Sequence, residues 1–84
     1  MVTSVGQLLK EERQKKHISL DEVEKQTRIR RKNIEAVEKG DWRIFSSKTY
    51  IQGIIRTYST YLDLDDEKIL AYFRREYERL ELVK

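Results

Sequence analysis

Apolar residues recur at intervals of three and four positions along nearly the whole chain, which is the spacing of helices that bury one face. Val5, Leu8 and Leu9 share one face of a predicted first helix over about 4–16. Ile69, Leu70, Phe73, Tyr77 and Leu80 follow the same rule in a predicted last helix over about 66–80, and Asp65 precedes it as a capping residue. The pattern predicts helices throughout and no strand.

A helix-turn-helix is predicted between these two segments. Ser19 and Glu22 form the S-x-x-E pattern of a capping box, so a second helix is expected to begin at Ser19 and to end near Thr27. A third helix over about 30–39 should end at Gly40, because glycine adopts the left-handed conformation of a helix end without strain. The connection 41–47 contains three apolar residues that we expect to pack on the core, namely Trp42, Ile44 and Phe45.

The helix predicted over 47–62 carries two apolar stripes instead of one. The stripe that is sufficient for a core consists of Ile51, Ile55, Tyr58 and Leu62. A second stripe lies about 100° further round the helix axis and consists of Tyr50, Ile54, Thr57 and Tyr61. Either the helix over 66–80 covers this second stripe, or Tyr50 and Ile54 remain exposed as anchors for another protein.

Gly53 lies in the middle of the same helix, where glycine costs about 1 kcal/mol relative to alanine. Close backbone approach, either by the helix over 66–80 or by a partner, would explain it. The fold class predicted from all five segments is all-α: a single domain over 1–84 in which a helix-turn-helix core of the Cro/repressor kind, about 4–40, is followed by two additional C-terminal helices, about 47–62 and 66–80.

The charge of the chain is uneven, which raises DNA binding as an alternative function. The formal net charge is +3, but residues 25–39 contain six basic and two acidic side chains, a net of +4. The candidate DNA-binding residues at the start of the third helix are Arg28, Arg30, Arg31, Lys32 and Asn33. Glu35 and Glu38 on that helix place negative charge near the path of a nucleic acid, which weakens this alternative.

Catalysis is not supported by the composition. The chain has no cysteine and one histidine, so we expect no catalytic residues, no metal site and no cofactor, and the acidic run 63–67 is interpreted as helix capping. The basic residues Arg13, Lys15 and Lys16 are interpreted as complementing the negative end of the first helix. No segment is long and apolar enough to span a bilayer.

A combined motif gives the chain a family resemblance. The helix-turn-helix is followed by an aromatic-x-x-Gly-hydrophobic-x-Arg-x-Tyr segment, formed here by Tyr50, Gly53, Ile54, Arg56 and Tyr58. With this pairing, nearly the whole chain resembles the N-terminal cytoplasmic domain of the RodZ family of bacterial cell-shape proteins. Two departures are Gln52, where the family often has arginine, and the serines at 46 and 47, where it often has proline.

The resemblance implies a non-enzymatic adaptor that binds the actin-like filament protein MreB. The implied interface is centred on Tyr50 and Ile54, with Lys48, Gly53, Thr57 and Arg56 as its neighbours. It also implies a cytoplasmic location at the inner face of the cell membrane, through a membrane span that lies outside this chain. The basic patch leaves a contact with acidic lipids as a further alternative, and the oligomeric state stays open.

Overall fold

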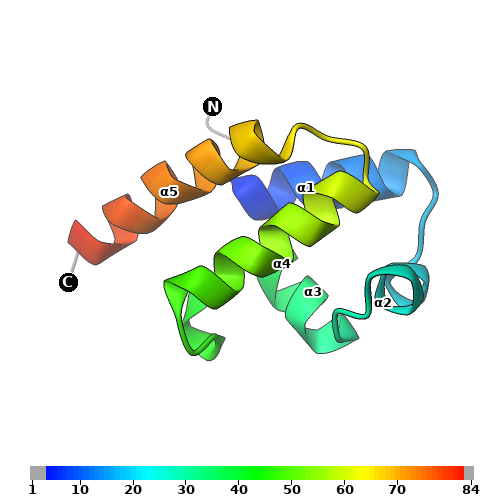
Figure 1. The fold of residues 1–84 in the computed structure, drawn as a ribbon, viewed down its shortest axis with the longest axis horizontal. Coiled ribbons are helices and arrows are strands. Elements are labelled where there is room, and N and C mark those ends of the chain that lie inside the picture. The colour runs from blue at the N-terminus through cyan, green and yellow to red at the C-terminus, as the bar shows by residue number, and fades with distance from the viewer. Residues whose placement is uncertain (1–3, 83–84) are drawn as a thin grey trace.

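The computed structural model describes residues 4–82 as five α-helices and one short 3₁₀ helix, with no strand in that range (Figure 1). The elements are α1 (Val5–Lys15), α2 (Leu20–Thr27), α3 (Arg31–Lys39), η1 (Trp42–Ile44), α4 (Lys48–Tyr61) and α5 (Asp66–Leu82). The predicted helices are all present with bounds within two residues of the expected ones. The all-α class with a helix-turn-helix is therefore confirmed.

Local hydrogen bonds explain where the helices begin. In four helices a side-chain oxygen immediately before the first turn accepts a hydrogen bond from a backbone N–H of that turn. Without this oxygen the N–H would have no partner within the helix. These oxygens belong to Ser4, Ser19, Ser47 and Asp65. The start of α3 is different, because Glu24 of α2 accepts a hydrogen bond from the backbone N–H of Arg31 at 3.0 Å. This bond ties the two helices of the helix-turn-helix together.

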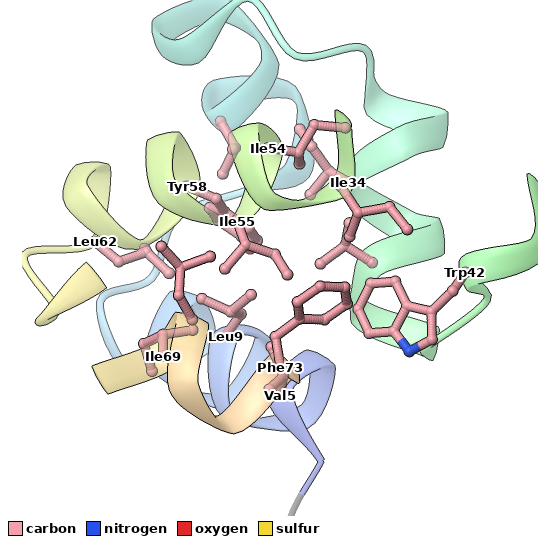
Figure 2. Packing of buried hydrophobic residues seen from close by; sticks show 14 residues of the cluster. Val5, Leu9, Ile34, Trp42, Ile54, Ile55, Tyr58, Leu62, Ile69 and Phe73 are labelled. Atoms are coloured by element: carbon pink, nitrogen blue, oxygen red, sulfur yellow. The ribbon is translucent and has the colours of Figure 1, made fainter. Parts of the chain in front are cut away.

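Helix α4 occupies the middle of the molecule, with α5 on one side and the α2–α3 pair on the other (Figure 1). Its first apolar stripe enters the core as predicted, since Ile51, Ile55, Tyr58 and Leu62 are all buried. Figure 2 labels three of them, Ile55, Tyr58 and Leu62, in one cluster with Leu9 of α1 and Phe73 of α5. The core is therefore shared by helices from both ends of the chain, and α4 is fixed against all of them.

Two expected core residues are exposed. Ile44 exposes 52% of its surface and Leu80 exposes 48%, so the expectation that they pack inward is wrong. The short 3₁₀ turn directs Trp42 into the core, where its ring meets Phe73 edge-on at 5.1 Å, and Ile44 at the end of that turn faces outward. Leu80 belongs to the last turn of α5, and the C-terminal end of this helix extends beyond the neighbouring helices (Figure 1).

Gly6 allows α1 to lie directly against α3. A Cβ atom at this position would be 2.2 Å from the backbone oxygen of Val37 and 2.5 Å from that of Glu38. These distances are far below van der Waals contact, and the obstructing atoms are backbone, which cannot move aside. The closeness of α1 and α3 thus requires glycine at position 6.

A buried polar cluster joins α1, α3 and α4. The guanidinium of Arg13 donates to both carboxylate oxygens of Glu38, from Nε at 2.7 Å and from Nη2 at 3.0 Å, and Tyr58 donates its hydroxyl to the same carboxylate. Arg13 also donates to the backbone oxygen of Ile18 at 2.9 Å. Arg13 does lie in the last turn of α1, where it was expected to complement the negative helix end, but its side chain is also a buried link between three helices, which was not expected.

Candidate protein-binding site

A groove of about 530 Å³ runs between α4 and the turn that joins α2 to α3. The turn contributes residues 27–30, and Asn33 follows from the first turn of α3. Helix α4 contributes five residues to the groove: Thr49, Tyr50, Gly53, Ile54 and Thr57. The groove therefore unites residues from both surfaces predicted from the sequence, the second stripe of α4 and the basic start of α3.

Tyr50 is the exposed aromatic residue of this groove. It exposes 49% of its surface, yet its position is fixed on two sides. Its ring lies 6.0 Å from that of Phe45, and its hydroxyl oxygen accepts a hydrogen bond from Nδ2 of Asn33 at 3.4 Å. A large side chain that is exposed and already oriented is the type of residue that dominates binding at protein interfaces, because little conformational freedom remains to be lost.

Ile54 differs from the expectation, since it exposes only 5% of its surface. The prediction that Tyr50 and Ile54 are both exposed is thus correct for the first and wrong for the second. The α2–α3 turn packs toward α4 at this point, so that Ile54 shares the groove wall with Thr27 and Ile29 and belongs to the core cluster seen in Figure 2. Ile54 is therefore a buried part of the groove wall. Its contact with a partner stays a prediction.

Gly53 and Thr57 line the groove and are exposed. No atom outside the local helix lies within 4 Å of the position where a Cβ of Gly53 would be. Close approach by α5, one of the two explanations of this glycine, is therefore excluded. The other explanation, approach by a partner to the open backbone surface at Gly53, stays a prediction.

Two of the predicted interface neighbours lie away from the groove. Nζ of Lys48 is 5.5 Å from the centre of the Tyr77 ring, a cation–π arrangement that holds α4 against α5. Arg56 forms an ion pair with Asp66 at 3.7 Å. Neither residue lines the groove beside Tyr50.

The basic cluster of the alternative DNA-binding site is also divided. Arg28, Arg30 and Asn33 line the groove, whereas Arg31 and Lys32 do not. Arg31 donates from Nη1 to Asp21 at 2.8 Å, and its Nε lies 3.5 Å from Glu35. The hydrogen bond to Asp21, with the negative charge behind it, raises the pKa of the Arg31 guanidinium. Arg31, the first residue of α3, is therefore paired with carboxylates of its own chain.

Other kinds of site are not seen in the part of the chain that the structure describes. Within residues 4–82 there is no group of three or more histidine, cysteine, aspartate or glutamate side chains placed to hold a metal ion. The helices of this range also include none with the length and apolar character needed to cross a membrane.

Comparison with known proteins gives the class of the domain. Residues 8–69 match the Helix-turn-helix domain family, and the chain belongs to that family. Among curated proteins, the chain is 31% identical over 67 residues to the cytoskeleton protein RodZ of Streptococcus pneumoniae, a match that covers 80% of this chain and 24% of that protein. The predicted resemblance to RodZ is thereby confirmed, and the chain spans about a quarter of the length of this relative.

Two solved structures share the fold. One is a chain from the complex in which bacterial actin MreB assembles with the cell shape protein RodZ, with a TM-score of 0.83, 24% identity and coverage of 90% of this chain and 93% of that chain. The other is YmfM from Staphylococcus aureus, a membrane protein with suggested DNA-binding activity, with a TM-score of 0.83, 26% identity and coverage of 88% and 90%. These matches extend over nearly all of the helices described above.

Proposed function

We propose that this chain is the cytoplasmic adaptor domain of a RodZ-like cell-shape protein and that it binds the actin-like filament protein MreB through the groove beside α4. The single observation that carries the proposal is the exposed, oriented ring of Tyr50 on a helix that is fixed in the core. The likeness to RodZ supports the choice of partner. In this proposal the domain has no catalytic role and acts at the inner face of the cell membrane, to which a further part of the full-length protein attaches it.

The rigidity of α4 favours this role. Tyr58 ties α4 to Glu38 of α3, and Ser47 fixes the first turn by accepting a hydrogen bond from the backbone N–H of Tyr50 at 3.1 Å. An anchor on such a helix needs no rearrangement before it binds, so less of the binding free energy is lost to ordering. Tyr50 is therefore expected at the centre of the interface, with Gly53 and Thr57 beside it.

Co-sedimentation with MreB filaments tests the proposal. Truncation of a central anchor typically costs about 2 kcal/mol or more, so Tyr50→Ala should weaken binding roughly 30-fold. Tyr72→Ala is the matched control, because Tyr72 is also an exposed tyrosine, at 37% compared with 49%, but lies on α5 away from the groove. The proposal is wrong if the Tyr50→Ala variant co-sediments with the filaments to the same extent as the Tyr72→Ala variant and the unmodified chain.

Sequence-specific DNA binding is the rival function, and the suggested activity of YmfM is the observation in its favour. The pairing of Arg31 with Asp21 and Glu35 weighs against it, because a phosphate would have to displace carboxylates already in place. A duplex titration at two salt concentrations separates the two functions. A DNA-binding regulator should keep a preference for one sequence at the higher salt concentration, whereas a basic patch should lose its binding altogether.

A further inference from the structure

Arg28 adopts a backbone conformation that its side chain does not favour. It ends α2 with φ 64° and ψ 13°, in the left-handed region, and its N–H donates to the backbone oxygen of Glu24 at 2.8 Å. In that region the Cβ of an L-residue crowds its own backbone, and glycine is the usual residue at such a helix end. The equivalent end of α3 has Gly40, with φ 73°. Arginine at position 28 therefore carries a conformational cost that glycine would not, as His17 and Asp63 also do with φ 59° and 63°.

The charge of Arg28 is available to a ligand. Arg28 and Arg30 are both exposed, and both line the groove beside Tyr50. Among the side chains that the structure describes, no carboxylate oxygen lies within 4.0 Å of either guanidinium, whereas the neighbouring Arg31 is paired with two carboxylates. Two unpaired cations thus border a groove whose wall is apolar at Ile54.

We propose that Arg28 and Arg30 form a carboxylate-binding subsite of the groove, so that the partner segment that docks there carries an acidic side chain next to apolar ones. This inference rests on the proposed function and specifies the chemistry of the bound segment. Apolar side chains of the segment contact Tyr50 and the open backbone at Gly53, and its carboxylate accepts hydrogen bonds from the guanidinium groups. Arginine suits this contact because its planar fork of donors matches the two oxygens of a carboxylate.

The surroundings of the subsite favour a protein segment over a nucleic acid. The groove wall is apolar at Ile29 and Ile54, which gives the apolar side chains of a protein segment a surface to contact. Just outside the groove, Asp21 and Glu35 hold Arg31, so a polyanion extending along α3 would meet carboxylates. A single acidic side chain avoids this repulsion, because its one negative charge lies at the two arginines and not beside Asp21 and Glu35.

Binding of purified MreB at two salt concentrations tests the subsite. Arg28→Gln and Arg30→Gln should each weaken binding about tenfold at low salt and make binding less dependent on salt, because each removes one charge contact. Lys32→Gln is the matched control: it removes an exposed cation of the same region that does not line the groove, and should change binding less than twofold. Arg28→Gly should weaken binding as much as Arg28→Gln without lowering the melting temperature, since glycine suits the left-handed conformation.

The outcomes separate the subsite from the proposed function. If the unmodified chain binds MreB and the Arg28 and Arg30 variants bind equally well with the same salt dependence, the subsite is wrong and the proposed function stands. If the unmodified chain does not bind MreB, both are wrong. If the variants lose duplex DNA binding and keep MreB binding, the two arginines are phosphate contacts and the subsite is again overturned.

A charge exchange identifies the acidic group on the partner. Arg28→Glu should abolish binding at low salt through repulsion of the partner carboxylate. Replacing acidic residues of MreB with lysine, one at a time, should then restore binding at one position. The subsite would be overturned if none of these lysine replacements in MreB restored binding to the Arg28→Glu variant.

Discussion

Tyr50 and Ile54 lie one helical turn apart on α4, and the first exposes 49% of its surface while the second exposes 5%. Ile54 belongs to the buried core cluster, against which Ile29 of the α2–α3 turn packs, whereas about half of the Tyr50 surface stays in solvent. The two residues therefore have different roles in the same groove. Tyr50 is available to a partner, and Ile54 holds the helix beneath it in place.

This difference predicts opposite effects on stability. Ile54→Ala should lower the free energy of unfolding by about 2–4 kcal/mol, because it removes buried methyl groups and leaves a cavity. Tyr50→Ala should change it by less than about 1 kcal/mol, because half of the side chain is in water and little core packing is lost. Urea unfolding followed by circular dichroism measures both. Equal losses of stability in the two variants would contradict the assigned roles.

Two glycine-to-alanine substitutions should also differ in sign. Gly6→Ala places a methyl group against the backbone oxygens of Val37 and Glu38, so it should force α1 away from α3 and cost about 3 kcal/mol or more. Gly53→Ala meets no neighbouring atom and should stabilise α4 by about 1 kcal/mol. Thermal melting of the two variants beside the unmodified chain tests this pair, and a melting temperature that falls equally in both would contradict it.

The more stable Gly53→Ala variant also tests the partner surface. If the partner approaches the backbone at Gly53, the added methyl group should weaken MreB binding although the domain itself is more stable. Unchanged binding in the co-sedimentation assay would show that the partner does not touch this part of α4.

Loss of one member of the buried cluster should be costly. Arg13→Met leaves the carboxylate of Glu38 buried without its cation, and removal of one partner of such a pair typically costs about 3–5 kcal/mol. Lys15→Met is the control, because Lys15 is an exposed cation on the same helix and its loss should cost less than about 0.5 kcal/mol. Denaturant unfolding of both variants gives the comparison. Similar stabilities would show that the cluster contributes little.

Stability should fall in strongly alkaline solution because of Tyr58. Burial, together with the hydrogen bond to Glu38, raises the pKa of the Tyr58 hydroxyl above its ordinary value of 10.0. Above pH 10 the unfolded chain therefore releases this proton while the folded chain keeps it, so the free energy of unfolding declines by up to about 1.4 kcal/mol per pH unit. Below pH 10 both states hold the proton and this contribution is constant.

Tyr58→Phe isolates that effect. The variant has no hydroxyl to ionise at position 58, so its stability should decline less steeply between pH 10 and pH 11 than that of the unmodified chain. Unfolding curves at closely spaced pH values give the two slopes, and identical slopes would mean that Tyr58 does not determine the alkaline behaviour.

The candidate site was only partly predictable. The spacing of α4 identified Tyr50, Gly53 and Thr57, and all three line the groove. It could not identify Arg28 and Arg30 as their neighbours, because the two groups come from segments that meet only when the turn packs on α4. For the same reason Lys48 and Arg56, which are close to Tyr50 in sequence, were expected at the site although the helix directs them toward α5.

The helices, their ends and the stripe that fills the core can all be inferred from the order of amino acids alone. Caps such as Ser19 and Ser47 act through hydrogen bonds to residues three positions away, and the period of a helix is visible in any window of a few turns. These features depend only on neighbours in the chain, so they can be inferred without knowledge of the fold.

Burial of side chains outside that stripe depends on how the helices pack together. Arg13 forms its ion pair with a carboxylate on α3, Gly6 meets backbone atoms of α3, and Ile54 is buried in a core cluster that several helices share. Each contact joins segments far apart in sequence, and burial is a property of the surface that another segment covers. The periodicity of one helix can show that a residue is able to face a partner, but the packing of the rest of the chain determines whether that face is already occupied.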